Sequence, residues 1–106
     1  MILITSEKIA GKRIVKTLGL VKGNTVRARH IGRDIAAAFR TIVGGEVVEY
    51  TKLIAESREQ SVDRMVESAT AIGANAIVQV RFGTSATMAG AAELLVYGTA
   101  VIVEDE

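Results

Sequence analysis

The residues with the clearest potential for binding chemistry share one face of a predicted helix. Tyr50, Ile54 and Arg58 follow one another at intervals of four residues, which places them on the same side of that helix. Tyrosine and arginine are amphipathic, and each needs a polar partner when it is buried. The favoured interpretation is that both side chains extend to the edge of the core. The alternative is that Arg58 meets a carboxylate, for which Asp34 is the candidate, or a neighbouring subunit. Asp34, Tyr50 and Arg58 are therefore the candidate ligand-binding residues.

His30 is the candidate metal ligand, because it is the only histidine in a chain that has no cysteine. Its neighbours Arg27, Arg29 and Arg33 disfavour the charged imidazolium form if they lie close to it. Further ligands would have to be carboxylates, or other copies of His30 that meet at a symmetry axis. The identity of any metal or cofactor stays open.

No motif for catalysis is present. Gly44-Gly45 is not followed by the Gly-Lys-Ser/Thr of a phosphate-binding loop, and no Gly-x-Ser-x-Gly element occurs. Four acids recur at helical spacing and are typical of a solvated helix face: Glu56, Glu59, Asp63 and Glu67. The sequence favours a non-enzymatic protein and predicts no catalytic residue. An enzyme whose site lies between subunits, built on Asp34, Tyr50 and Arg58, is an alternative.

The elements that must position these residues follow from hydrophobic periodicity. It predicts strands at residues 1–5, 13–22 and 26–29, a short helix at 33–43, a long helix at 46–72, and strands at 75–82 and 94–103. Apolar residues change faces near Gly19, which indicates a bulge. Residues 22–25 are predicted to form a turn, Gly44-Gly45 a corner between helices, and residues 83–92 a mobile loop.

Two of these elements define the expected core. The long helix is predicted to bury Met65, Ala69 and Ile72 at the end of its apolar stripe. The strand at 94–103 is apolar on both faces, so both faces must be covered. A helix can cover one face, and a partner subunit is the natural candidate for the other. The chain is therefore expected to be incomplete as a monomer.

Charge is distributed unevenly along the chain. Residues 1–40 contain nine Lys and Arg and two acids, whereas residues 41–106 contain four Lys and Arg and ten acids. One interpretation is a surface that binds nucleic acid or another polyanion. The favoured interpretation is that basic and acidic surfaces of neighbouring elements or subunits face each other, because aromatic residues for base stacking are nearly absent.

Length and composition predict a single domain, 1–106, in a cytoplasmic protein. The chain has 106 residues, 49% of them hydrophobic, which suits one domain of ordinary size. Its longest apolar-rich run is about half of what a membrane helix requires. We expect the protein to associate with itself, without membrane partners, and a nucleic-acid partner is not favoured.

A set of short segments in fixed order resembles the YbjQ-like family of small bacterial and archaeal proteins. The segments are Arg33-Asp34-Ile35, Ile42-Val43-Gly44-Gly45, Tyr50, Lys52, Ile54, Arg58-Glu59, Gly73-Ala74-Asn75-Ala76-Ile77-Val78 and Gly98-Thr99-Ala100-Val101. The resemblance implies an α+β subunit with a small antiparallel sheet, similar to dodecin subunits and assembled as a ring-shaped homopentamer. The family is largely uncharacterised and carries a heavy-metal-binding label, which implies a metal or small-ligand role.

One departure from that family concerns acidic residues. Many relatives carry Asp-x-Asp-Tyr-Glu after the strand that follows Gly-Ala-Asn-Ala. The corresponding positions here are Arg81, Gly83, Thr84 and Ser85. A soft-metal site inside one subunit therefore has few ligands to draw on.

Overall fold

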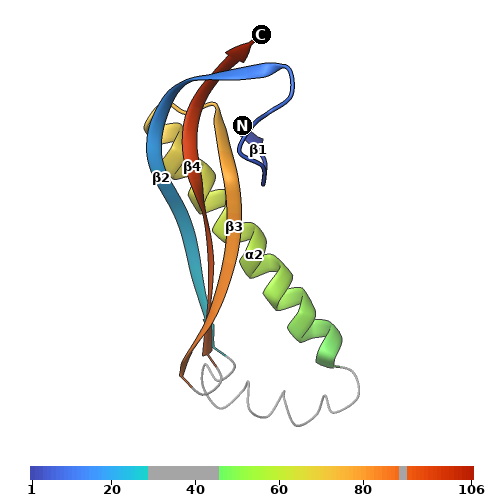
Figure 1. Cartoon of the computed structure of the whole chain (residues 1–106). Coiled ribbons are helices and arrows are strands. Elements are labelled where there is room, and N and C mark those ends of the chain that lie inside the picture. The colour runs from blue at the N-terminus through green and yellow to red at the C-terminus, as the bar shows by residue number, and fades with distance from the viewer. Residues whose placement is uncertain (29–45, 89–90) are drawn as a thin grey trace.

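The computed structural model describes residues 1–28, 46–88 and 91–106, and in these ranges a four-stranded sheet carries a long helix on one face (Figure 1). The elements are β1 (Ile2–Leu3), β2 (Lys12–Ala28), α2 (Glu46–Ala71), β3 (Ala76–Met88) and β4 (Ala91–Asp105). The strand order is β1-β3-β4-β2, with β4 antiparallel to both neighbours and β1 parallel to β3. The α+β class is confirmed. An antiparallel sheet was expected; β2, β4 and β3 pair in this way, but the sheet is mixed because β1 pairs parallel to β3. The predicted short helix lies outside the described residues.

β2 runs through the segment that was predicted to turn. The bulge predicted at Gly19 is confirmed by a register shift at this point and by a φ of 122°. Residues 22–25 stay extended, however, because Gly23 lies directly against α2. A Cβ at this position would collide with the backbone of Ser61 and lie 2.6 Å from the amide nitrogen of Met65. Glycine therefore serves close approach of a helix here, and not a turn.

α2 covers one face of the sheet through a narrow buried stripe. Met65 and Ala69 are fully buried, as predicted, and α2 packs mainly against β2 and β4. Ile72 is 49% exposed, so its predicted burial was wrong. The reason is that α2 ends at Ala71 and the chain turns at Gly73, whose φ is 88°.

Hydroxyl groups fill part of the contact between α2 and the sheet. Ser57 and Ser61 are fully buried one turn apart on α2. The Thr25 hydroxyl lies 3.1 Å from the Ser57 carbonyl oxygen and 3.0 Å from the Ser61 hydroxyl, while Ser61 donates to the Leu94 carbonyl at 3.2 Å. These bonds satisfy the buried hydroxyls and tie α2 to both β2 and β4.

A second, smaller core lies on the other face of the sheet, where residues 1–11, the N-terminal segment, cross it. Ile2, Ile4 and Ile9 pack there on a buried cluster. The cluster consists of Ala76, Val78, Val101 and Val103. The side-chain amide of Asn75 joins the two strands beneath it, because it donates to the Val103 carbonyl at 2.9 Å and accepts from the Val103 amide at 2.8 Å.

The two C-terminal strands extend into the predicted loop. Residues 83–88 belong to β3 and residues 91–92 to β4, so most of the loop expected at 83–92 is paired strand. Small residues such as Gly, Ala, Ser and Thr are compatible with both structures, and strand pairing decides between them. Residues 89–90 lie outside the described ranges.

Candidate functional site

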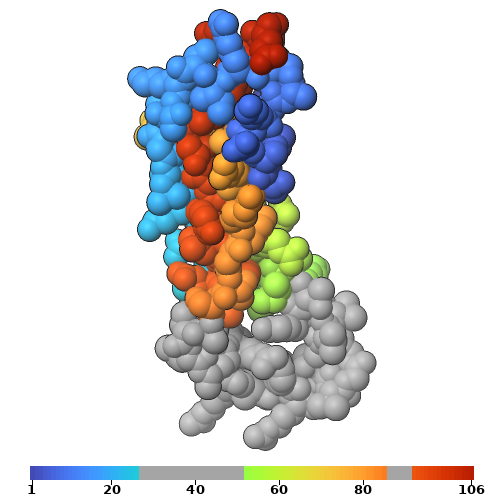
Figure 2. Space-filling view, viewed as in Figure 1, coloured from blue at the N-terminus to red at the C-terminus, as the bar shows by residue number. Residues whose placement is uncertain are grey.

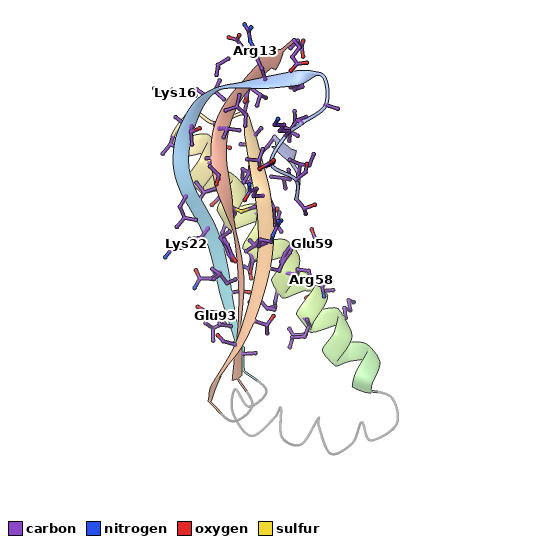
Figure 3. The ribbon with its side chains drawn as sticks, in the orientation of Figure 1. Arg13, Lys16, Lys22, Arg58, Glu59 and Glu93 are labelled. Carbon is purple, nitrogen blue, oxygen red and sulfur yellow. The ribbon has the colours of Figure 1, made fainter. Side chains whose placement is uncertain are left out.

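The residues predicted to bind a ligand are not gathered into a site by the described part of the chain. Asp34 and His30 lie outside the described residues. Tyr50 belongs to α2, but its side chain is not described. Arg58 is exposed on α2, next to Glu59, and makes no ion pair within the described residues (Figure 3). The predicted contact between Arg58 and Asp34 stays a prediction.

The donor set for a soft metal ion is poor. Among the described side chains, no group of three or more His, Cys, Asp or Glu residues lies close enough together to hold a metal ion. The whole sequence contains one histidine and no cysteine, and thiolate and imidazole are the ligands that soft metals prefer. The residues present do not fit a heavy-metal centre within one copy.

Arg81, one of the positions that depart from the acidic family pattern, has a structural role. Its guanidinium donates to the Thr5 carbonyl at 2.7 Å and to the Val80 carbonyl at 2.9 Å. These bonds hold the N-terminal segment against β3, together with backbone bonds from Val80 to Ile4 and from Gln79 to Ser6. The guanidinium of Arg81 thus anchors the N-terminal segment to β3.

The most distinctive surface is an apolar patch on the sheet face opposite α2. Leu20 and Val26 of β2 are 73% and 55% exposed, and Tyr97 of β4 is 39% exposed. Lys22 lies among them, paired in register with Tyr97. Val21, Gly23 and Thr25, which alternate with these residues, are buried towards α2, whereas Asn24 is exposed and donates a hydrogen bond to Glu93 at 3.2 Å. We call Leu20, Lys22, Val26 and Tyr97 the open sheet patch.

The open sheet patch is uncovered because the N-terminal segment reaches only part of this face. In Figure 2, dark-blue N-terminal atoms cover its upper part, while the red and orange atoms of β4 and β3 lie uncovered below them. Val101 and Val103 of β4 are buried beneath that cover, whereas Tyr97 is exposed. The same strand thus has a closed half and an open half on one face.

β2 also forms one edge of the described sheet, because β4 is its neighbour on one side only. An unpaired strand edge offers free backbone donors and acceptors, and lysines on such an edge oppose uncontrolled pairing. Lys16 and Lys22 lie on this side of the molecule (Figure 3). Edge and patch together form a surface suited to controlled association.

Part of the basic segment is neutralised within the chain. Lys12 pairs with Asp105, and Arg13 pairs with Glu104 at 3.2 Å. The ammonium of Lys12, which donates a hydrogen bond to the Asp105 carboxylate, lowers the pKa of Asp105 below its ordinary value of 3.8. These two pairs support the interpretation that basic and acidic elements face each other. Glu104 and Asp105 of the acidic C-terminus belong to β4 and are exposed.

The acids of α2 form an exposed stripe with no such partners. Glu56, Glu59, Asp63 and Glu67, the acidic stripe, point away from the buried positions of the helix. The first three line a shallow groove with Lys52 and other residues of α2. None of the four makes an ion pair within the described residues. The predicted solvated helix face is confirmed for the single copy.

Sequence reasoning missed the open sheet patch although one signal was present. The change of apolar face at Gly19 places Leu20 on the side opposite the core residue Val21. The mistaken turn at 22–25 then separated Leu20 from Val26 and hid their common face. Reading β2 as one continuous strand would have found the patch.

Comparison with known proteins gives a consistent family and fold. A family model described as "Putative heavy-metal-binding" (YbjQ) matches residues 1–104. A UPF0145 protein of Dehalococcoides mccartyi is 58% identical over 104 residues, covering 98% of this chain and 100% of the relative. One of Methanosarcina acetivorans is 55% identical over 101 residues, covering 95% of both. The crystal structure of a DUF74-family protein of unknown function from Pediococcus pentosaceus has a TM-score of 0.63 at 12% identity, covering 98% of both chains. That similarity concerns the fold alone.

In the described ranges, no helix combines the length and the apolar character that crossing a membrane requires.

Proposed function

Because the chain belongs to the YbjQ family and a single copy leaves part of its sheet uncovered, we propose that it functions as a subunit of a non-enzymatic homo-oligomer. The observation that carries this proposal is the open sheet patch. Leu20 is 73% exposed in β2, directly after the bulge at Gly19, and exposed apolar surface of this kind marks interaction sites. Association would remove this surface from water.

A closed ring of five copies is the proposed form of the assembly. The number comes from the family resemblance. The physical support is that β2 is an edge strand with an apolar face, whereas the opposite side of the molecule carries the acidic stripe. Contacts between two different surfaces build rings when the rotation closes. The cytoplasm is the proposed location.

Any ligand site would lie between copies. The described part of one copy does not assemble a soft-metal centre, and the family's heavy-metal description is not matched by the ligands of this chain. A small polar ligand held by Asp34, Tyr50 and Arg58 at a subunit boundary is the proposed binding role. An Arg58→Ala variant that binds every ligand of the native assembly unchanged would contradict it.

Sedimentation velocity of the purified protein tests the proposed assembly. At micromolar concentration, we expect one species of about five times the 11.2 kDa chain mass. Leu20→Asp should shift the protein towards monomer, because the charge cannot be buried without a partner. A monomeric wild-type protein at that concentration would contradict the proposal.

Polyanion binding is the second candidate function, since Lys16 and Lys22 have no carboxylate partner within the described residues. It is less well supported because Lys12 and Arg13 are already paired. The test is a titration with DNA and RNA at low ionic strength. Binding that weakens steeply with salt would support this function, and a flat titration would exclude it.

A further inference from the structure

We infer that copies of the chain associate head to tail, with Lys22 and the open sheet patch of one copy docked on the acidic stripe of α2 in the next. This inference rests on the proposed self-association and adds which two surfaces meet. The occupant of the open sheet patch is thus a second copy of the same chain.

The two surfaces lie on opposite sides of one molecule. In Figure 3, Lys16 and Lys22 lie beside the outer edge of β2, whereas Arg58 and Glu59 lie across the molecule on α2. Lys22 cannot reach the acidic stripe of its own chain. A contact between Lys22 and the acidic stripe must therefore join two copies. A row of such contacts leaves one open sheet patch free at one end and one acidic stripe free at the other, until a ring closes.

Charge complementarity selects this partner. Neighbouring acids of the stripe are three or four residues apart on α2, so their carboxylates repel one another. An ammonium group from another copy relieves this repulsion. Lys22 is exposed, makes no ion pair within the described residues and lies next to Leu20 and Tyr97 on its face of the sheet. Opposite charges of this kind determine which surfaces pair.

Apolar surface borders the acidic stripe and complements the rest of the patch. Val62 and Val66 are partly buried on α2, where they flank the main core. Phe82 of β3, two residues beyond the buried Val80, is 54% exposed because α2 packs mainly on β2 and β4. This side of α2 and β3 thus offers apolar contacts for Leu20 of another copy, next to acids for Lys22 of that copy.

The opposite arrangement, in which two open sheet patches pack face to face, is less favourable. A two-fold contact places the same patch on both sides of the interface. It would bring the Lys22 ammonium groups of both copies together without an acid from the stripe, and the carboxylate of Glu93 on this face already accepts a hydrogen bond from Asn24. Like charges in such an interface are unfavourable, so head-to-tail packing is the arrangement that the charges favour.

A charge swap tests the inference. Lys22→Glu and Glu59→Lys should each raise the concentration at which the assembly half dissociates by about tenfold or more. The double variant, which reverses both charges, should return that concentration to near the wild-type value. Dissociation is measured by sedimentation on the full chain, and circular dichroism checks that each variant is folded. Glu56→Lys replaces Glu59→Lys if the latter does not fold.

Matched controls use exposed charges of the N-terminal segment. Lys8→Glu and Glu7→Lys make the same changes in net charge away from both surfaces, and they should leave dissociation within about twofold of wild type. Single variants that dissociate like wild type, or a double variant that dissociates as easily as the single ones, would overturn the inference. The proposed function would still stand if the wild-type protein is an oligomer. A monomeric wild type would overturn both.

Mixing the two single variants tests the direction of the contact. Lys22→Glu subunits carry acids on both surfaces, and Glu59→Lys subunits present a lysine on each surface, so alternating copies restore opposite charges at every contact between unlike subunits. Equal mixtures should therefore associate more strongly than either variant alone. In a ring with an odd number of copies, one contact stays mismatched, so recovery is incomplete. A mixture no stronger than its components would overturn the inference.

Discussion

The two halves of one sheet face differ in whether the N-terminal segment covers them. Beneath the N-terminal segment, Val101 and Val103 are buried by Ile2, Ile4 and Ile9. Farther along the sheet, Tyr97 of β4 and Leu20 of β2 are exposed, and the N-terminal segment does not cover them. The comparison teaches that the fold closes one half by itself, and under the proposed assembly another copy covers the other half.

The largest effect is expected in the closed half. Val101→Asp places a charge where the side chain is 1% exposed, and it should lower the free energy of unfolding by roughly 3–5 kcal/mol. Urea unfolding at one fixed protein concentration measures the change. Val101→Ala, which only creates a cavity, should cost about 2 kcal/mol. A Val101→Asp protein as stable as wild type would show that this half is not closed.

Removing the amide of Asn75 should weaken the same half more mildly. Asn75→Ala loses two hydrogen bonds to the backbone of Val103, and a loss of about 1–2 kcal/mol is expected. The control is Asn24→Ala, which removes an exposed hydrogen bond from Asn24 to Glu93 at 3.2 Å and should cost under about 0.5 kcal/mol. Equal losses for both variants in thermal unfolding would argue against this difference.

In the open half, the same kind of substitution should affect assembly and not the fold. Leu20→Asp should change the stability of the isolated chain by no more than about 0.5 kcal/mol, because Leu20 makes few contacts within it. Light scattering should nevertheless report a much smaller particle. Ile72→Asp is the matched control, an exposed apolar residue outside the open sheet patch, and it should assemble normally. Loss of assembly in both variants would remove the special role of the patch.

The smallest effect concerns the ion pair at the C-terminal end of β4. Lys12 lowers the pKa of Asp105 in the folded state, so the pair contributes stability above the unfolded pKa. That contribution disappears as pH falls below 3.8 through the lower folded pKa. In Lys12→Gln, an NMR titration should show the pKa of Asp105 returning towards its ordinary value. An unchanged titration would mean that the pair does not persist in solution.

The sequence predicted local features well where one physical signal dominated. The periodicity of residues 46–72 led to α2 within one residue of its end, and the shift of apolar faces located the bulge at Gly19. It failed at Gly23, because a glycine beside Asn24 resembles a turn, whereas here it admits the backbone of α2. The residues next to Gly23 in the sequence do not show that a helix packs against it.

The candidate surfaces were predicted less well, because they depend on contacts distant in sequence. The acids of α2 were identified by their helical spacing. The cover provided by Ile2, Ile4 and Ile9 was not identified, because it depends on the pairing of β1 with β3, which lies more than seventy residues later in the sequence. Without that placement, the division between the closed and open halves could not be drawn.

Hydroxyl-radical footprinting at increasing protein concentration tests the central claim most directly, because it measures the exposure of individual side chains. If a second copy covers the open sheet patch, oxidation of Leu20 and Tyr97 should fall as the assembly forms, while oxidation of the exposed Ile72 stays constant. If Leu20 and Tyr97 are oxidised at the same rate in dilute and concentrated protein, no copy covers this face and the account is wrong.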